Sequence, residues 1–195
     1  MHPDQLSSLR SAVSGRRLLI GVGGGIATYK VCSLVSALAQ AGAEVTVAMT
    51  EAATRFVTPL TFEALSGRAV LTSVWEQVAS HDPQHIALAR DAAAMLVAPC
   101  TMDLLARLAC GRADDVVSLL AASIDRATTP VLLAPSMNDA MWRQPATQRN
   151  LRTLAEDGFR IVQPGVGWQA CRTVGTGRLP EPEELAVALG AAVGK

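Results

Sequence analysis

The stretch RLLIGVGGGIATYK, residues 17–30, decides the fold of this chain. Its first half, Arg17–Gly23, is an apolar run of strand length that ends in three successive glycines. From Ile26 onwards the apolar residues have helical spacing until Gly42, where a helix would stop. A second strand, Glu44–Met49, follows directly. The sequence therefore predicts a complete β-α-β unit within this first quarter of the chain.

The same alternation continues to the end of the chain. Further strands are predicted at 93–98, 130–134 and 159–162, and further helices at 59–66, 86–92, 102–110, 114–124, 144–157 and from 182 onwards. This order is typical of a parallel sheet with right-handed crossovers. We expect an α/β, Rossmann-like (flavodoxin-like) three-layer fold with a central parallel sheet. Residues 69–83 look irregular and exposed, and residues 164–178 form a glycine-rich stretch too long for a simple connector.

Length and composition indicate one domain of a soluble protein. We assign it to residues 16–195, with residues 1–15 as an N-terminal extension. Lys and Arg number 17, as do Asp and Glu, which disfavours nucleic acid and membranes as partners. No uncharged apolar run is long enough for a bilayer, and no apolar N-terminal segment indicates secretion. The four cysteines lack the close pairs of a zinc site, so we expect a cytoplasmic protein without a metal.

The glycine turn after the first strand suits an anion. Gly24, Gly25, Ile26 and Ala27 bring main-chain N–H groups to the positive end of a helix, where a phosphate binds well. The spacing departs from the G-x-G-x-x-G pattern of dinucleotide sites, so a mononucleotide such as FMN fits better than NAD. The alternative is a purely structural turn, in which glycine only lets a strand lead into a helix.

Polar groups follow two further strands at the same edge of the sheet. Thr50 comes after the second strand and Thr101 after the third, each as a donor to a ribityl or phosphate oxygen or, alternatively, as a helix cap. The segment Pro99, Cys100, Thr101 and Met102 carries main-chain N–H groups that could face the pyrimidine edge of a flavin. Ligands of open α/β sheets bind at these carboxyl ends.

Three later features suggest chemistry, each with a plainer alternative. The segment PSMNDAMW, residues 135–142, places an amide, two thioethers and an indole after a strand, where a helix cap and core packing are the alternative. Cys171 lies in the glycine-rich stretch, followed by Arg172 and Arg178, and mobile backbone beside a thiol suggests a flap that closes over a site. The alternative for Cys171 is a small buried core residue. His85 begins a helix, where an exposed cap is the alternative to a catalytic role.

Together these segments resemble the family of homo-oligomeric flavin-containing cysteine decarboxylases over about residues 16–185. The matching segments are GGIA at 24–27, His85-Ile86, Ala98-Pro99, PSMNDAMW at 135–142, and Ala170-Cys171 through Gly175, Gly177 and Arg178. The chain departs from the family at CTMD, residues 100–103, where the family often has Ala-Thr-Ala-Asn. It also departs at Arg172, which is often glycine, and at Leu179, which is often methionine. These departures concern substrate detail and the geometry of the flap.

The resemblance implies FMN as the cofactor and decarboxylation of 4′-phosphopantothenoylcysteine to 4′-phosphopantetheine in coenzyme A biosynthesis. It implies that His85 and Cys171 are catalytic, with Cys171 as the late proton donor. Asn138 would bind the substrate carboxylate beside Met137 and Met141. Contacts to FMN are implied for Gly24, Gly25, Ile26, Ala27, Thr50, Pro99, Cys100, Thr101, Met102 and Ser136. A homo-oligomer is implied as well, a trimer or a multiple of trimers with the site between subunits.

Three other functions remain open. A peptidyl-cysteine oxidative decarboxylase would stop at an enethiol and would not need Cys171. A flavin prenyltransferase would share the sheet and the glycine turn but has no reason to carry the 135–142 motif. A non-catalytic flavoprotein that acts as a regulatory subunit would not need to retain His85, Asn138 and Cys171.

Overall fold

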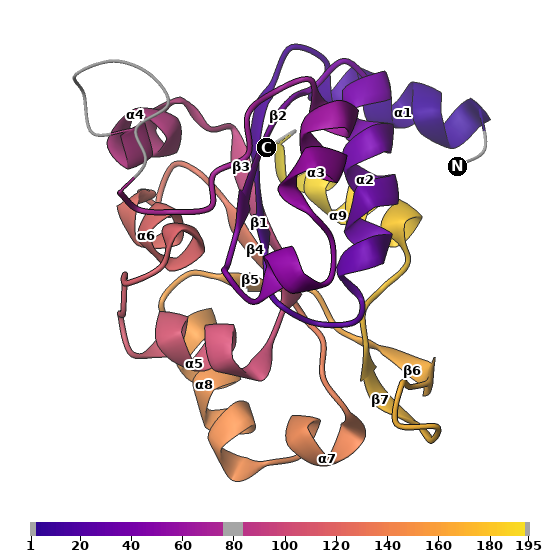
Figure 1. Ribbon diagram of the computed structural model, residues 1–195, viewed down its shortest axis with the longest axis vertical. Helices are drawn as coiled ribbons and strands as arrows, with labels where there is room; N and C mark the ends of the chain where they lie inside the picture. Colours follow the sequence, from indigo (N-terminus) through magenta and orange to yellow (C-terminus); the bar gives the residue numbers. More distant parts are fainter. Residues whose placement is uncertain (1–2, 76–83, 194–195) are drawn as a thin grey trace.

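A five-stranded parallel sheet forms the centre of the molecule (Figure 1). The computed structural model describes residues 3–75 and 84–193. Within them the strand order is β2-β1-β3-β4-β5, with β1 at Arg17–Val22, β2 at Glu44–Met49, β3 at Ala94–Cys100, β4 at Val131–Pro135 and β5 at Arg160–Ile161. This is the order of doubly wound, flavodoxin-like folds, so the predicted fold class is confirmed.

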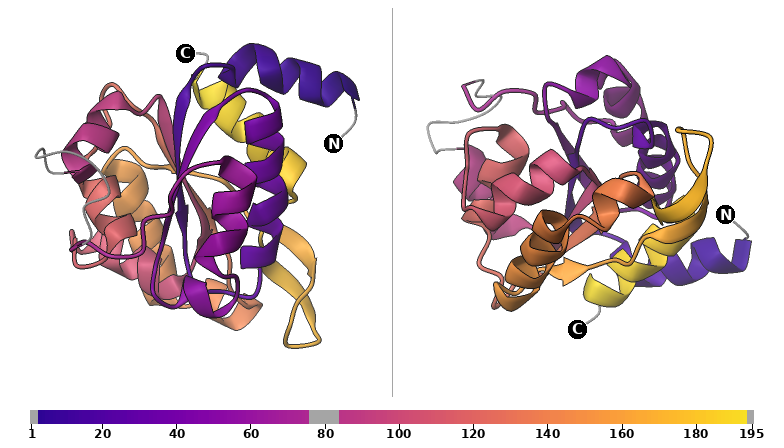
Figure 2. Two further views of the ribbon diagram at one scale, coloured as in Figure 1. Left: turned by 45° about the horizontal axis from the view of Figure 1, so that its top comes forward. Right: turned by 90° about the horizontal axis from the view of Figure 1, so that it is seen from below.

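Helices cover both faces of this sheet (Figures 1 and 2). One face carries α1 (Pro3–Val13), α2 (Thr28–Gln40), α3 (Pro59–Ser66) and α9 (Pro182–Val193), and the other carries α4 (Gln84–Asp91), α5 (Met102–Ala109), α6 (Val116–Ser123) and α8 (Pro145–Glu156). Because side chains alternate along a strand, β1 sends Leu18, Ile20 and Val22 into one core and Leu19 into the other. None of the helices in the described residues is long and apolar enough to cross a membrane.

The carboxyl ends of the central strands are held together by loop hydrogen bonds. The N–H of Gly23 donates to the carbonyl of Pro99 at 3.1 Å, and the N–H of Ser136 donates to the carbonyl of Cys100 at 3.0 Å. The neighbouring strands β1 and β3 lead into α2 and α5, which lie on opposite faces. A crevice for ligands forms where the connections diverge in this way.

The N-terminal residues form a helix that joins the core. Leu9 and Val13 of α1 are buried in the cluster that also contains residues of α2 and α9. The mixed composition of residues 1–15 conceals this helix because only one of its faces is apolar. The proposed domain boundary at residue 16 stays a prediction.

The glycine-rich stretch at 164–178 is not an irregular connector. It forms an antiparallel hairpin of β6 (Gly165–Trp168) and β7 (Val174–Arg178), which stands apart from the main sheet (Figure 1). Glycines are unfavourable inside strands, so the sequence hides this hairpin, which is stabilised by contacts to the loop before α7 (Asp139–Trp142).

Two predictions near β2 also need correction. Thr50 precedes only a single 3₁₀ turn, η1 (Ala53–Arg55), rather than an α-helix. Val70 and Leu71 are buried rather than exposed, because Leu71 pairs with Ala48 beside the edge strand β2. Residues 76–83 of the segment predicted to be irregular lie outside the described residues.

Candidate active site

The turn between β1 and α2 presents bare N–H groups. In the parts of the chain that the structure describes, the main-chain N–H groups of Gly24, Gly25, Ile26 and Ala27 have no hydrogen-bond acceptor. The hydroxyl of Thr28 closes the turn by donating to the carbonyl of Gly25 at 2.7 Å. These donors stand at the N-terminus of α2, where the helix dipole is positive. The turn therefore has the donors and the field that a phosphate needs.

Two glycines of the turn have different roles: Gly24 allows close packing, and Gly25 leaves room for a ligand. A Cβ on Gly24 would overlap Ala52, so this glycine lets the loop after β2 approach. A Cβ on Gly25 would meet its nearest neighbour, Thr101 Cγ2, at an ordinary 3.6 Å. The absence of a side chain at Gly25 thus leaves space in front of the N–H groups rather than room for packing. Both the structural and the ligand interpretation of the turn have support.

A cavity of about 480 Å³ opens beside the turn. It is bordered by the turn, the loops after β3 and β4, α7 and the hairpin, through Gly24, Gly25, Ile26, Ala27, Tyr29, Lys30, Thr101, Met102, Ser136, Met137, Asn138, Met141, Trp168, Gln169, Gly177, Arg178 and Leu179. This volume is within the range of small-molecule sites. One space therefore collects most of the residues predicted to bind cofactor or substrate.

Asn138 borders this cavity and also begins α7. Its Oδ1 accepts a hydrogen bond from the N–H of Met141 at 2.8 Å, so the helix-cap interpretation is correct as far as it goes. The amide nitrogen has no acceptor among the described residues, which leaves its two N–H donors available to a ligand. A neutral donor of this kind can hold a carboxylate without the strong charge pairing of an arginine.

Hydrogen bonds fasten the hairpin to the start of α7. The N–H of Met137 donates to the carbonyl of Gly177 at 3.0 Å, and the N–H of Thr176 donates to Oδ1 of Asp139 at 3.3 Å. Gly177 has a φ of +120°, and a Cβ there would overlap the carbonyl of Met137. The glycines of the hairpin are therefore needed for this close contact, which closes one wall of the cavity.

Cys171 lies in the turn between β6 and β7 and is exposed, so the alternative of a buried structural cysteine does not apply. Its Sγ lies 3.0 Å from Oγ1 of Thr173 and 3.7 Å from Oε1 of Gln169. The next residue, Arg172, has a φ of +65°. This left-handed conformation costs a residue with a Cβ about 1 kcal/mol, so the position suits glycine better than arginine.

A charged cluster joins the base of the hairpin to α2. Lys30, with only 9% of its surface exposed, pairs with Oε1 of Glu181 at 2.9 Å. Arg178 of β7 reaches the same oxygen at 2.5 Å. The hydrogen bond from Lys30, with help from Arg178, holds the pKa of Glu181 below its ordinary value. A single carboxylate therefore connects the first turn of α2 with the end of β7 at the rim of the cavity.

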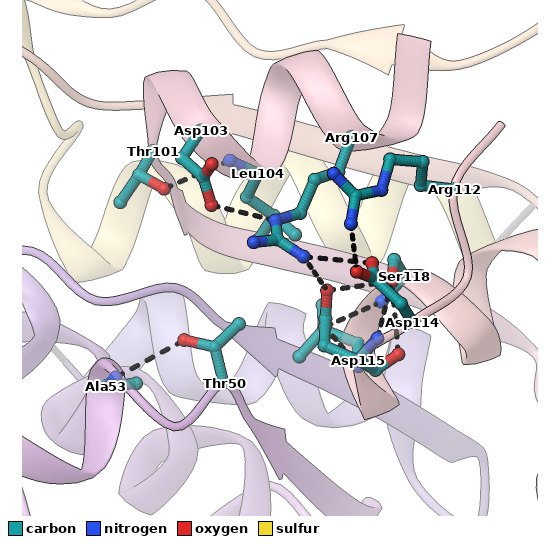
Figure 3. A network of polar contacts seen from close by, with 11 residues as sticks. Thr50, Ala53, Thr101, Asp103, Leu104, Arg107, Arg112, Asp114, Asp115 and Ser118 are labelled. Atoms are coloured by element: carbon teal, nitrogen blue, oxygen red, sulfur yellow. Dashed lines mark hydrogen bonds and ion pairs between the residues drawn. The ribbon is translucent and has the colours of Figure 1, made fainter. Parts of the chain in front are cut away.

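A second cavity, of about 640 Å³, adjoins the first one, and the two share Gly24, Thr101, Met102 and Met141. Figure 3 shows polar contacts beside it. Thr50 Oγ1 accepts a hydrogen bond from the N–H of Ala53 at 3.2 Å, and Thr101 Oγ1 accepts one from the N–H of Leu104 at 3.3 Å. Thr101 thus caps α5, whereas Thr50 accepts a hydrogen bond within the turn that leads into η1, and each hydroxyl keeps its own proton to donate.

The far wall of the second cavity is charged but internally paired. Arg107 holds Asp103 at 2.8 Å and Asp114 at 2.9 Å (Figure 3). Asp115 accepts from the N–H groups that open α6 and from the hydroxyl of Ser118. These contacts fix the loops around the cavity.

Four predicted site residues, Pro99, Cys100, Cys171 and His85, border neither cavity. The Cys100 side chain is fully buried in the core, where burial raises the pKa of its thiol, so only its main chain lies at the site. His85 begins α4, and Figures 1 and 2 show α4 on the opposite side of the molecule from the hairpin. A single chain therefore does not bring His85 and Cys171 together.

Sequence reasoning misses four residues that border the first cavity: Tyr29, Lys30, Trp168 and Gln169. Tyr29 and Lys30 directly follow the glycine turn, so their position in the first turn of α2 was a usable signal. Trp168 and Gln169 enter the site only because the glycine-rich stretch folds into a hairpin, which local propensity does not indicate.

The unpaired N–H groups of the glycine turn lie where the strand order of the sheet reverses, between β1 and β3. Nucleotides bind at this point of flavodoxin-like sheets, so the class of the protein is an α/β protein of the nucleotide-binding kind. The chain belongs to the Flavoprotein family, whose model matches residues 6–193. The resemblance to flavin-containing cysteine decarboxylases is thereby confirmed, with support from solved structures.

Two comparisons with curated relatives narrow the relationship. The chain is 44% identical over 173 residues to the coenzyme A biosynthesis bifunctional protein CoaBC of Vibrio vulnificus (strain YJ016), which covers 89% of this chain and 42% of the relative. It is 46% identical over 170 residues to CoaBC of Mycolicibacterium smegmatis, which covers 87% and 40%. The chain thus spans about two fifths of the length of these relatives.

Two solved structures have the same fold. The FMN-dependent cysteine decarboxylase SpaF superposes with a TM-score of 0.78 at 32% identity and covers 92% of this chain and 96% of its own. A PPC decarboxylase mutant complexed with pantothenoylaminoethenethiol superposes with a TM-score of 0.79 at 26% identity and covers 89% and 96%.

Proposed function

We propose that this chain catalyses the FMN-dependent decarboxylation of 4′-phosphopantothenoylcysteine to 4′-phosphopantetheine in coenzyme A biosynthesis. The observation that carries the proposal is the first cavity, which is bordered by the anion-binding turn, by Asn138 and by the hairpin that bears Cys171. The relatives named for coenzyme A biosynthesis, at 44% and 46% identity, support it. So does the fold shared with a PPC decarboxylase mutant.

FMN fits the donors at the edge of the sheet. The N–H groups of residues 24–27 would hold its phosphate, Thr50 and Thr101 its ribityl hydroxyls, and Ser136 with the main chain of residues 99–102 its ring system. When bound, FMN would supply reversible two-electron oxidation of the substrate thiol to a C=S group. That group can accept the electron pair that is released with carbon dioxide.

The chain's own residues would bind the substrate and move its protons. The two N–H donors of Asn138 hold the carboxylate until it leaves, beside the apolar surfaces of Met137 and Met141. The C=C bond of the resulting enethiol gains a hydride at one carbon and a proton at the other. Cys171 supplies that proton and becomes a thiolate, which solvent reprotonates.

We also propose that the active unit is a homo-oligomer, a trimer or a multiple of trimers. Within one chain, α4 with His85 lies on the opposite side from the hairpin with Cys171 (Figures 1 and 2). If both residues act on one substrate, they come from different subunits. Exposed apolar side chains beside the cavity, Ile26, Tyr29 and Trp168, are suited to cover by a second copy.

The test is to purify the protein without added cofactor, record its visible spectrum and assay it with 4′-phosphopantothenoylcysteine. A flavin spectrum and release of carbon dioxide with saturated product are expected. A colourless and inactive protein would contradict the proposal.

A peptidyl-cysteine oxidative decarboxylase is the second candidate, because the fold is also shared with SpaF, an FMN-dependent cysteine decarboxylase. A peptide ending in cysteine serves as the competing substrate in the same assay. An enethiol product from the peptide, with no turnover of the small substrate, would favour this second function.

A further inference from the structure

Gln169 is the only buried polar side chain of the hairpin, with 8% of its surface exposed. An amide in such a place is unfavourable unless its hydrogen bonds are made. Gln169 makes them to three partners: its Nε2 donates to the carbonyl of Thr176 at 2.9 Å, and its Oε1 accepts from the N–H of Asp139 at 3.2 Å and from Sγ of Cys171 at 3.7 Å. These partners belong to β7, α7 and the turn of the hairpin.

The Oε1 atom of Gln169 therefore connects the start of α7, where Asn138 would hold the substrate carboxylate, with the thiol of Cys171. The N–H of Asp139 directly follows Asn138 and would otherwise be one of the unpaired donors at the start of α7. Cys171 reaches the same Oε1 from the hairpin. Because an amide oxygen can only accept, the contact with Cys171 exists only while the sulfur carries its proton.

The main chain of Gln169 adds to this connection. Its N–H donates to the carbonyl of Thr173 at 2.8 Å, and its carbonyl accepts from the N–H of Arg172 at 2.9 Å. These two bonds close the turn that contains Cys171. The side chain of Gln169 then fixes this closed turn against α7. Rotation or loss of the amide would free the turn without removing the thiol.

We propose that Gln169 is a positioning residue that sets the place of the Cys171 proton relative to the substrate held by Asn138. This inference deepens the function proposed above and rests on it. The step concerned is the last one, in which one carbon of the enethiol C=C bond gains a hydride and the other carbon gains the proton of Cys171. Oxidation and decarboxylation precede that step and do not use the thiol of the hairpin.

Gln169→Met tests this role because methionine keeps the volume and removes the polar atoms. Gln148→Met is the matched control: Gln148 also donates to a main-chain carbonyl, that of Trp142 at 2.7 Å, but among the described residues it has no hydrogen bond to the hairpin. Without any substrate, we expect faster amide hydrogen exchange at Asp139 and Thr176 in Gln169→Met and unchanged exchange there in Gln148→Met.

Rapid mixing with 4′-phosphopantothenoylcysteine then separates the two halves of the reaction. In Gln169→Met, we expect flavin reduction at the wild-type rate, within about twofold, and flavin reoxidation slowed at least about tenfold, because a displaced proton donor slows only its own step. Equal slowing of both halves, or reoxidation at the wild-type rate, would overturn the role of Gln169. A wild-type protein that never reduces its flavin would instead overturn the proposed function itself.

Discussion

Asn138 uses the two ends of one amide group for different purposes. Its oxygen caps α7, whereas its nitrogen is left to the cavity. An aspartate at this position keeps an oxygen for the cap, since Asp is as good a cap as Asn, but it removes the donors. The cap and the proposed carboxylate contact can therefore be separated by one substitution.

We expect Asn138→Asp to change the free energy of unfolding by less than about 0.5 kcal/mol because the cap survives. Turnover should fall by at least about a hundredfold, because two carboxylates would face each other at the site. Thermal unfolding and the decarboxylation assay measure the two effects. Asn138→Ser, which also caps but carries no charge, should lose less activity. Equal turnover of Asn138→Asp and the wild type would rule out the carboxylate contact.

Cys171 is one of two exposed cysteines in the described residues, and Cys110 is the other. We expect Cys171→Ser to oxidise and decarboxylate the substrate but to stop before the final reduction, since a hydroxyl is a much weaker acid than a thiol. The unsaturated product and reduced flavin should accumulate, which mass spectrometry and absorbance detect. Cys110→Ser is the control and should turn over normally. Normal saturated product from Cys171→Ser would disprove the assignment.

At the scale of the element, the hairpin depends on a strained residue. Arg172 adopts a φ of +65°, so Arg172→Gly should stabilise the folded turn by about 0.5–1 kcal/mol. Hydrogen exchange of the hairpin amides should slow by a few-fold. Arg172→Ala removes the same charge but keeps the strain, so it should not slow exchange. Equal protection in both variants would mean that the arginine side chain, not the backbone, matters.

The elements differ in how well the sequence predicts them. The strands β1, β3 and β4 are predictable because each is an apolar run of strand length that is buried on both faces. The turn at Gly24 is predictable for the same reason, since it sits between such a strand and an amphipathic helix. The hairpin is not, because Gly175 and Gly177 serve a contact with α7 that exists only in the folded molecule. Gln169 enters the site only through that contact.

At the scale of the whole molecule, no sequence pattern indicates whether His85 and Cys171 share a site. The placement of α4 away from the hairpin suggests a meeting between subunits. The sequence cannot show this, because periodicity and capping describe one chain at a time. A test of whether the two residues act together must therefore combine subunits that carry different substitutions.

We expect His85→Ala and Cys171→Ser to form no saturated product separately and to complement each other when co-expressed. In random mixtures, about a quarter of the sites would combine an intact His85 with an intact Cys171 from the neighbouring subunit. Formation of the saturated product measures complementation, and co-expression of Cys171→Ser with wild type calibrates the mixing. No recovered activity in mixed oligomers would place both residues in one chain.

Acidification should loosen the junction of α2 and β7. Lys30, with Arg178, lowers the pKa of Glu181 in the folded state, so the stability from this cluster is present above the ordinary pKa of a glutamate. It is lost as the pH falls through the lower, folded-state pKa. Between about pH 6 and about pH 3, the protection factors of the hairpin amides, which divide out the intrinsic pH dependence of exchange, should fall more in the wild type than in Glu181→Gln. Parallel pH profiles of the two proteins would contradict this.

The carboxylate of Glu181 also couples the two halves of the site, which are the glycine turn before α2 and the hairpin with Cys171. Lys30 lies in the first turn of the helix that would receive a phosphate, and Arg178 lies at the end of β7, the strand that follows the turn with Cys171. If phosphate binding at the glycine turn stabilises the closed hairpin, then closure of the hairpin strengthens phosphate binding by the same factor, because such coupling is reciprocal. When no cofactor phosphate is bound at the glycine turn, a trypsin-like protease should therefore cleave the bond after Arg172 faster. The rate of degradation of the protein would then depend on how much cofactor is available to it.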